Sequence, residues 1–302
     1  MNAQIYHHLQ IFHAIVQTKG ISAAARKLHI SPPVVSSALK SLEQHIGLLL
    51  IQRNTRSMEL TDAGQQLYQD TLPLMQSLNL AIESVQDLGE TPTGTVRITV
   101  PRFAYHHIIK PHYAQFCRLY PKILLEISVF DGTIDIQKEQ FDLGIRFGDK
   151  VADGMVARQL LPAMKDCLMV SPTYIAQYGI PKTPQELIHH RLIGYRFITA
   201  KQLLPLIIND GGEEREIDMP LSLIVNDEVD LLVDATRQGL GIGRIFESTL
   251  NQQPDRENFI PILQDYWVSY APVYLYYHQH SQKAKRIKVL IDFLLDKMTQ
   301  IA

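Results

Sequence analysis

The 302-residue sequence predicts an α/β fold, with a helical N-terminal segment followed by a longer body in which strands and helices alternate. Three observations carry this prediction. Apolar residues recur at helical spacing over residues 5–88, short β-type and helix-type runs alternate after Thr95, and the charge divides unevenly between the two parts. The length also suggests two or three domains.

The composition is that of an ordinary globular chain, with 46% apolar and 20% charged residues. No apolar run reaches the roughly 18 residues that a membrane span needs, and the N-terminus lacks the pattern of a secretory signal. Two cysteines, Cys117 and Cys167, give no disulfide framework and are expected to be buried structural thiols. We therefore expect a cytoplasmic protein without a membrane partner.

Basic residues are concentrated at the N-terminus. Residues 1–60 contain six lysines and arginines but only two glutamates, a net charge of +4, whereas the whole chain carries −2 and the remainder therefore −6. A basic head on an acidic body fits a local electrostatic footprint on nucleic acid. A solvated basic surface would explain the same distribution, so the charge alone leaves DNA binding open.

The first sixty residues predict three helices. A helix over about 5–17 carries one apolar stripe, and Gly20 is expected to make the left-handed turn that follows it. Ser22 is expected to cap a second helix over 23–28. After a turn at 29–30, Ser31 and Pro32 begin a third helix that ends at Gly47. Its predicted buried face comprises Val35, Leu39, Leu42 and Ile46.

Two short helices, a tight turn and a third helix with an open polar face form a helix-turn-helix, whose last helix enters the major groove of DNA. Facing away from the apolar stripe are Pro33, Ser36, Ser37 and Lys40. Serine hydroxyls donate or accept at base edges, and small side chains let the backbone approach a thymine methyl group. A three-helix bundle with an ordinary polar face explains the periodicity equally well.

Longer motifs decide between these interpretations. Residues 23–33 (AAARKLHISPP), 42–47 (LEQHIG) and 60–64 (LTDAG), with Leu50 and Arg53 between them, strongly resemble the LysR-type transcriptional regulators. The resemblance implies a β-wing over residues 50–60 and double-stranded DNA as a partner. The residues expected to contact DNA are Ser22, Ser31, Pro32, Pro33, Ser36, Ser37, Lys40, Arg53 and Arg56.

Three positions depart from the family pattern. The family usually has glutamine where Pro32 stands, often arginine where Ser37 stands, and phenylalanine where Ile51 stands. Long polar side chains at the first two positions would each give roughly 1–3 kcal/mol of discrimination between bases. The target sequence is therefore open, and recognition is expected to depend more on DNA shape.

A long helix is predicted to follow the head, capped by Thr61 and running to about Leu88. Its apolar residues Leu74, Leu78, Ala81, Val85 and Leu88 are spaced four, three, four and three apart, as in the seam of a two-helix coiled coil. Pro73 is expected to kink or weaken the helix, and residues 90–94 to form a hinge. A helix packed on its own chain is the alternative; the resemblance favours a homodimer or homotetramer.

In the body, the alternation predicts parallel sheets with crossover helices. Strands are expected at 96–100, 124–129, 141–146, 192–195, 222–225, 242–246 and 273–277, and helices at 104–119, 173–177, 227–237 and 283–298, with a short helix before 141. The motifs at 141–148, 171–174, 184–187 and 239–243 are similar to the LysR-type effector domain. This resemblance implies two periplasmic-binding-protein-like lobes, joined near 162–165 and 266–267.

The predicted organisation has three parts. They are a winged helix-turn-helix at 1–60, a linker and dimerisation helix with its hinge at 61–90, and an effector-binding domain at 91–302. Lobe I covers about 91–163 and 267–302, and lobe II about 164–266. We therefore expect a sequence-specific DNA-binding transcription regulator, modulated by a small molecule bound between the lobes.

Ligands of open α/β sheets lie at the carboxyl ends of strands, against helix N-termini. The residues that fit this rule are Arg102, Phe103, Phe130, Phe147, Thr199, Asn226 and Asp227. Arg102 begins a helix and would offer a fork to a carboxylate, unless it is an ordinary surface arginine. Arg146 is expected to be structural or at the cleft edge. The identity of the effector does not follow from the sequence, and no cofactor is predicted.

Other candidate sites are weaker. The adjacent histidine pairs at 7–8, 106–107 and 189–190 diverge on a helix and make poor joint metal ligands, so no metal is predicted. The glycines of 239–243 follow a helix and precede a strand, the reverse of a dinucleotide fingerprint. Because no catalytic constellation appears, no enzyme and no catalytic residue are expected. A solute-binding protein and an effector-independent DNA-binding repressor stay open as alternatives, as does RNA polymerase as a further partner.

Overall fold

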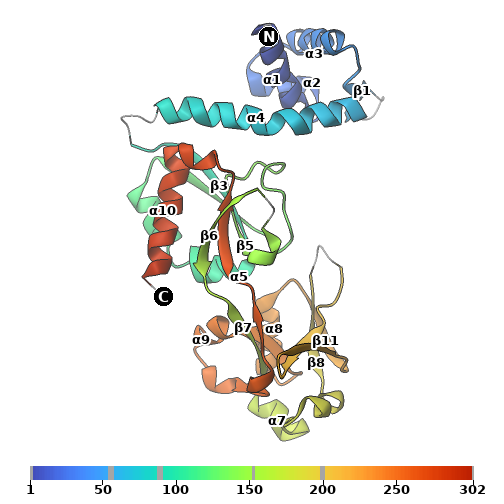
Figure 1. Ribbon diagram of the computed structural model, residues 1–302, viewed down its shortest axis with the longest axis vertical. Helices are drawn as coiled ribbons and strands as arrows, with labels where there is room; N and C mark the ends of the chain where they lie inside the picture. Colours follow the sequence, from blue (N-terminus) through green and yellow to red (C-terminus); the bar gives the residue numbers. More distant parts are fainter. Residues whose placement is uncertain (1–2, 54–57, 87–90, 152–153, 198–200, 301–302) are drawn as a thin grey trace. The chain divides into compact units, whose positions relative to one another are not determined.

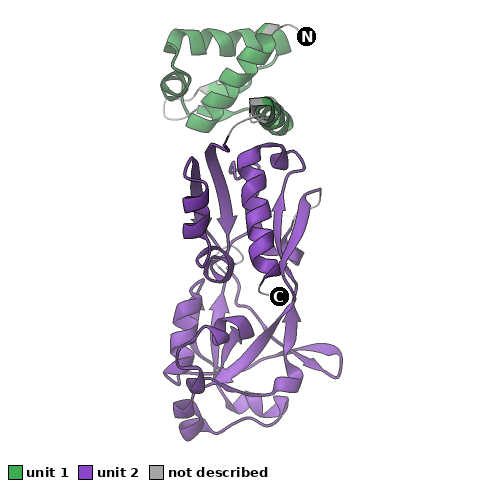
Figure 2. Cartoon of the chain, turned by 90° about the vertical axis from the view of Figure 1, so that its left-hand side faces the viewer, with its two compact units in different colours: residues 1–85 green, residues 86–302 purple. Residues whose placement is uncertain are grey.

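The computed structural model describes residues 3–53, 58–86, 91–151, 154–197 and 201–300. The chain divides into two compact units, residues 1–85 and 86–302 (Figure 2). The first unit is helical with one β-hairpin, and the second combines sheets and helices (Figure 1). Within the described residues, no helix is both long and apolar enough to cross a membrane.

The first unit begins with α1 (Ala3–Thr18), α2 (Ile21–Leu28) and α3 (Pro32–Ile46). They enclose an apolar core in which Phe12, Val35 and Leu39 are almost completely buried. Helix α3 begins with proline and ends at Gly47, whose φ of 79° lies in the left-handed region. The helix-turn-helix predicted from periodicity, capping residues and glycine is therefore confirmed.

Three details at the helix ends differ from the prediction. Lys19, with φ 55°, makes the left-handed turn after α1, so Gly20 is extended at φ 178°. Gly20 is also the N-cap of α2, which places Ser22 inside the helix, where it caps nothing. Ile46 is 37% exposed rather than buried, because it is the last residue of α3 and lies one turn beyond Leu42, where the buried face ends.

A β-hairpin follows α3, formed by β1 (Ile51–Arg53) and β2 (Met58–Leu60) in antiparallel register. The Glu43 carboxylate of α3 accepts the N–H groups of Leu50 and Ile51 at 2.9 and 3.3 Å, which holds the hairpin against this helix. The β-wing implied by the family resemblance is thus present.

Helix α4 (Asp62–Gln86) closes the first unit. The Thr61 hydroxyl caps it by accepting the N–H of Gly64 at 3.0 Å, as predicted. The early turns of α4 pack on the head core through Leu67 and Tyr68. The helix continues through Pro73 without a break, so the proline does not divide it.

The first lobe of the second unit contains a five-stranded sheet in the order β4-β3-β5-β15-β6. Its strands are β3 (Gly94–Val100), β4 (Ile123–Val129), β5 (Leu143–Phe147), β6 (Val156–Leu161) and β15 (Val273–Tyr277). β3 is parallel to β4 and β5, whereas β15 is antiparallel to β5 and β6. The predicted parallel pairing is therefore confirmed for β3, β4 and β5 but is wrong for β15, because the chain re-enters this sheet from the second lobe in the opposite direction.

Helices pack on this sheet and fill its core with Ile108, Phe116 and Leu290. The helical segments of this lobe are α5 (Arg102–Ala104), the π-helix η1 (Tyr105–Ile109), α6 (Tyr113–Leu119), η2 (Gly148–Lys150), η6 (Ser281–Lys283) and α10 (Lys285–Thr299). The single helix predicted over 104–119 is interrupted around Pro111, which lacks the N–H needed to continue a helix. The short helix expected before 141 is instead a turn, in which Phe141 N–H donates to the Ile136 carbonyl at 2.7 Å.

In the second lobe, β7 (Met164–Val170) pairs antiparallel with three strands, and two further strand pairs form sheets of their own. The partners of β7 are β12 (Gly243–Phe246), β13 (Ile260–Pro261) and β14 (Val268–Tyr270). Strands β8 (Leu192–Arg196) and β11 (Leu221–Asn226) form a parallel pair. Strands β9 (Leu206–Asp210) and β10 (Glu213–Ile217) form an antiparallel hairpin. The helices are α7 (Pro172–Tyr178), η3 (Pro184–His189), α8 (Val229–Arg237), α9 (Glu247–Asn251), η4 (Arg256–Asn258) and η5 (Gln264–Tyr266).

Two short connections join the lobes. The first lies between the end of β6 at Leu161 and the start of β7 at Met164, within the predicted crossing. The second lies at residues 271–272, after β14, which still pairs with β7. The return expected near 266–267 is therefore several residues too early, because the three-residue strand β14 gives no clear periodicity in the sequence.

Candidate functional site

The outer face of α3 consists of short side chains. Pro32, Pro33, Ser37 and Lys40 are exposed, and Ser36 is half-buried. Val34, which the sequence reasoning missed, is 46% exposed beside Pro33 and adds an apolar contact to the same face. The sequence signal for Val34 was that an apolar residue stands next to the start of the helix but does not belong to its buried stripe. This end of α3 therefore offers small hydroxyl and apolar groups rather than long polar side chains.

The other predicted DNA contacts lie around this helix. Ser31 is the exposed N-cap of α3, and its side chain makes no capping hydrogen bond. Ser22 is exposed on α2. Arg53 ends β1, but its side chain and the whole of Arg56 lie outside the described residues.

The second half of α4 carries an exposed apolar stripe. Leu74, Leu78, Ile82 and Val85 are 69%, 41%, 52% and 65% exposed. Ile82 belongs to this exposed stripe, whereas Ala81, which was predicted at this point of the stripe, is half-buried. Leu88 lies outside the described residues. The stripe keeps the three- and four-residue spacing that lets one helix pack along another.

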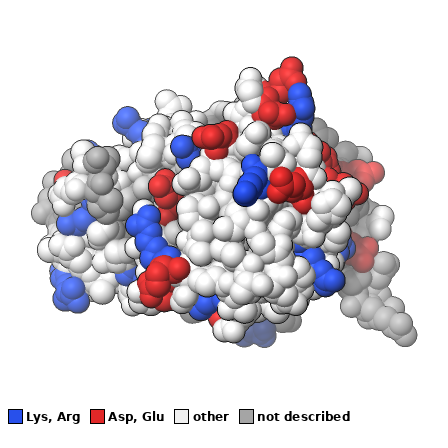
Figure 3. Space-filling view, turned by 90° about the horizontal axis from the view of Figure 1, so that it is seen from below, with Lys and Arg blue, Asp and Glu red and all other residues white. Residues whose placement is uncertain are grey.

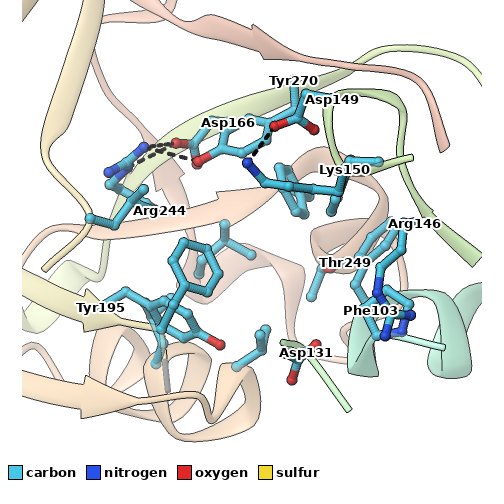
Figure 4. A pocket seen from close by; sticks show the side chains of 18 of the residues that line it. Phe103, Asp131, Arg146, Asp149, Lys150, Asp166, Tyr195, Arg244, Thr249 and Tyr270 are labelled. Carbon is cyan, nitrogen blue, oxygen red and sulfur yellow. Dashed lines mark hydrogen bonds and ion pairs between the residues drawn. The ribbon is translucent and has the colours of Figure 1, made fainter. Parts of the chain in front are cut away.

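A cavity of about 610 Å³ lies between the two lobes of the second unit (Figure 4). This volume is within the range of small-molecule sites. Six aromatic residues line it, namely Phe103, Phe147, Tyr195, Phe197, Phe246 and Tyr270. Its charged lining residues are Asp131, Arg146, Asp149, Lys150, Asp166 and Arg244.

Four of the rings form a continuous cluster across the lobes. Phe103 and Phe147 come from the first lobe, and Phe246 and Tyr270 from the ends of β12 and β14 in the second. Ring centroids of Phe103 and Phe246 are 5.2 Å apart, and those of Phe246 and Tyr270 are 5.0 Å apart, both edge-to-face. Such a wall suits a flat apolar ligand.

Arg244 and Asp166 form an ion pair at one end of the cavity (Figure 4). Arg244 Nε lies 2.8 Å from Asp166 Oδ2, and each side chain is only 6% exposed. Arg244 also donates to the carbonyl of Pro205 at 2.6 Å. Because β12 and β7 carry the two residues, the pair joins neighbouring strands of the second lobe.

Arg146 has the structural role expected of it. Its side chain is 4% exposed and donates to the carbonyls of Thr99, Ile145, Phe130 and Gly132 and to the Thr99 hydroxyl, over 2.7–3.3 Å. These contacts join β3, β5 and the loop after β4, so the guanidinium organises the cavity wall.

Arg102 connects the two lobes instead of presenting an open fork. Its Nη1 lies 2.9 Å from Glu228 Oε2 in the second lobe, and its Nε lies 3.8 Å from Asp131 Oδ2. The residue does not line the cavity. A carboxylate of the protein therefore occupies the position in which the sequence suggested a ligand.

The remaining predicted effector residues divide into two groups. Phe103 and Phe147 line the cavity, whereas Phe130, Asn226 and Asp227 do not. Thr199 lies outside the described residues. The lining residues Tyr195, Phe246 and Tyr270 were not predicted, although each stands at or near the end of a strand, which was the signal that could have found them.

The cysteines differ from each other. Cys167 is buried, as expected, and burial together with the negative charges of Glu247 and Asp166 raises the pKa of its thiol to about 12. Cys117 is exposed, contrary to expectation, because it lies on the outer side of α6 while the neighbouring Phe116 points into the core. Within the described residues, no three histidine, cysteine, aspartate or glutamate side chains gather as metal ligands would.

One face of the molecule, shown in Figure 3, mixes both signs of charge. Lysine and arginine side chains lie near aspartate and glutamate side chains among many uncharged ones, with no broad basic area among the coloured residues. Nucleic acid is attracted by a basic patch or stripe, which this face does not supply.

Two family models match the chain. The model "Bacterial regulatory helix-turn-helix protein, lysR family" matches residues 6–65, and "LysR substrate binding domain" matches residues 89–299. Among relatives, the transcriptional regulator PgrR of Escherichia coli is 26% identical over 286 residues, covering 95% of each chain. The uncharacterized regulator YcaN of Escherichia coli is 28% identical over 283 residues, covering 94% of this chain and 92% of the relative.

Solved structures share the fold along nearly the whole length. CrgA of Neisseria meningitidis is 23% identical, with a TM-score of 0.61 and coverage of 99% of both chains. LysG of Corynebacterium glutamicum, solved with its bound effector Arg, is 18% identical, with a TM-score of 0.66 and 99% coverage of both chains.

Proposed function

Because this chain belongs to the LysR family of transcription regulators, with a helix-turn-helix domain and an effector-binding domain, we propose that it binds operator DNA as a homodimer or homotetramer through α3. A small molecule held between the lobes modulates this binding, and no cofactor takes part. The observation that carries the proposal is the exposed N-terminal end of α3, with short polar side chains in a basic head. The chain acts where its DNA is, in the cytoplasm.

Several features support DNA contact by this end of α3. A helix N-terminus directs N–H groups and a partial positive charge toward a phosphate, and the Ser31 hydroxyl stands beside it. Lys40 is exposed on the same helix and can neutralise a further phosphate. Because the side chains at 32–34, 36 and 37 are short, base readout consists of close contacts, and DNA shape contributes the rest.

Replacing Ser36 and Ser37 together by alanine is expected to weaken binding to the operator about tenfold or more, since each lost base contact is worth about 1 kcal/mol or more. Affinity for random DNA should change little, because phosphate contacts supply it. Fluorescence anisotropy with both DNAs measures the ratio. Ser77→Ala in α4 is the matched control. Equal losses on both DNAs would mean that the two serines only support the helix.

The exposed stripe of α4 is proposed as the seam between two chains. Leu78→Glu with Val85→Glu should convert the oligomer into smaller species, because two like charges would meet their symmetry mates across the seam. Light scattering measures the mass. Asn79→Glu, exposed but off the stripe, is the control and should leave the mass unchanged. An unchanged mass for the double variant would show that α4 is not the seam.

A gel-shift series on the DNA upstream of the chain's own gene tests the proposed function. We expect a retarded complex that survives competition by random DNA and weakens steeply as salt is raised. A folded protein that binds no upstream fragment more tightly than random DNA would contradict it.

A further inference from the structure

The cations around the interlobe cavity already have partners. Arg244 pairs with Asp166, and Arg146 donates to a row of carbonyls. Lys150 lies 2.8 Å from Asp149, and both of these side chains are more than half exposed. A ligand carboxylate would therefore have to displace an existing contact of each lining cation.

Asp131 differs from these groups. Its Oδ1 accepts the backbone N–H of Arg102 at 2.7 Å, but its Oδ2 lies 3.8 Å from the nearest cationic atom, Arg102 Nε, beyond hydrogen-bond distance. The Arg102 guanidinium instead approaches Glu228, at 2.9 Å. Only 13% of the Asp131 side chain is exposed. A carboxylate that is mostly withheld from water is stabilised when a further donor or a cation reaches it.

Both signs of charge surround Asp131, from the carboxylate of Asp227 and the guanidinium groups of Arg102 and Arg146. Burial raises the pKa of the Asp131 carboxyl and repulsion from Asp227 adds to this, whereas the N–H of Arg102 and the charges of Arg102 and Arg146 oppose it. The pKa of the Tyr195 hydroxyl is also raised, by burial and then by Asp131 and Asp227. Figure 4 shows Asp131 and Tyr195 at the end of the cavity opposite Tyr270 and Asp166. At this end of the cavity, the Asp131 carboxylate offers an acceptor that an ammonium group can reach.

From the aromatic cluster and the Asp131 carboxylate, which has no cation within hydrogen-bond distance, we propose that the cavity selects an aromatic amine. The aromatic ring lies against Phe103, Phe147, Phe246 and Tyr270, and the ammonium donates to Asp131 Oδ2 beside the Tyr195 hydroxyl. Aromatic faces in the lining add cation–π attraction for the ammonium group. This inference rests on the proposed function, since it names the ligand class of the effector pocket.

The test is a calorimetric titration of the full chain with four matched compounds. Phenethylamine carries both features, 3-phenylpropanoate replaces the ammonium by a carboxylate, 2-phenylethanol removes the charge, and 2-cyclohexylethylamine removes the aromatic ring. We expect phenethylamine to bind at least about tenfold more tightly than 3-phenylpropanoate and 2-phenylethanol, as loss of a charge-assisted hydrogen bond would give. It should also bind more tightly than 2-cyclohexylethylamine, which loses the contacts between aromatic rings. Binding of 3-phenylpropanoate as tight as that of phenethylamine, or no binding of phenethylamine, would overturn the inference.

Variants locate the ammonium. Asp131→Asn keeps an oxygen for the Arg102 N–H but removes the charge, and should weaken phenethylamine at least about tenfold. Asp218→Asn, at an exposed aspartate that does not line the cavity, is the control and should bind it as the parent does. Unchanged binding by Asp131→Asn would overturn the assignment. Since burial makes the Asp131 charge unfavourable in the folded state, this variant should melt at pH 7 no lower than the parent, which separates lost binding from unfolding.

The pH dependence of phenethylamine binding gives an independent test of the ligand class. Protonation of Asp131 removes the charge that the ammonium needs, so phenethylamine should bind more weakly as pH falls, beginning above the usual range of an aspartate because its pKa is raised. The gel shift reports DNA binding without any ligand. A failed amine titration with an intact gel shift therefore rejects the ligand class alone, whereas a failed gel shift rejects the proposed function.

Discussion

Asp166→Ala is expected to lower the free energy of unfolding of the second unit by about 3–5 kcal/mol, the cost of leaving a buried charge without its partner. The carboxylate meets Arg244 Nε at 2.8 Å, and both side chains are 6% exposed. After the substitution, the guanidinium keeps the Pro205 carbonyl but has no counter-charge. Urea unfolding followed by the fluorescence of Trp267, which packs in the core of this lobe, measures the change.

Two controls separate the lost partner from a general loss of packing. Asp166→Leu combined with Arg244→Met removes both charges and should restore most of the stability, as an apolar pair of similar volume does. Asp255→Ala breaks the more exposed pair with Arg237, whose atoms approach to 2.6 Å, and should cost much less. A double variant as unstable as Asp166→Ala would show that the ion pair is not the cause.

Leu39→Ala is expected to destabilise the head by about 2–5 kcal/mol, because it leaves a cavity among closely packed side chains. Leu39 is 2% exposed and lies on the inner face of α3, against the same core as Phe12 and Leu42. Since that core holds the helix, operator binding should fall with the stability. Hydrogen exchange of the α3 amides measures the opening free energy of this unit separately from the body.

Lys40→Ala, at the next position and exposed, provides the comparison. Its stability should remain within about 0.5 kcal/mol of the parent. The slope of log affinity against log salt should fall by about one, as for one lost phosphate contact. Unchanged exchange in Leu39→Ala would contradict the assigned core.

The head was predictable because its signals are local. Pro32 at a helix start, Gly47 at a helix end and apolar residues one turn apart each act within a few residues, and the structure agrees with them. The errors there concern single positions. Lys19 took the left-handed turn that Gly20 was expected to make, although both residues stand in the same short link.

The body was less predictable because its contacts are distant in sequence. The direction of β15 depends on the chain having passed through the whole second lobe, and short strands such as β13 and β14 have too few residues to show a period. Arg102 was predicted to offer a fork to the carboxylate of a ligand, but it does not line the cavity. Its partner is Glu228, 126 residues away, which only the folded chain brings near.

In the effector site, too, the sequence did not predict which individual residues line the cavity. The loop after β4 was predicted to line the cavity, but Phe130 was chosen where Asp131 faces it. Which of two adjacent residues faces inward depends on how the strand ends, and one residue of shift exchanges the faces. That difference replaces an apolar contact by a carboxylate and changes the class of ligand expected.

The central claim is that this chain recognises a DNA sequence through paired copies of α3. A nuclease-protection footprint of the full chain on the DNA upstream of its own gene tests it most directly. We expect two protected segments whose centres are separated by about 10–10.5 base pairs, or a multiple of this spacing, as two recognition helices on one face of the duplex require. Uniform cleavage across the fragment by a folded, oligomeric protein would contradict it.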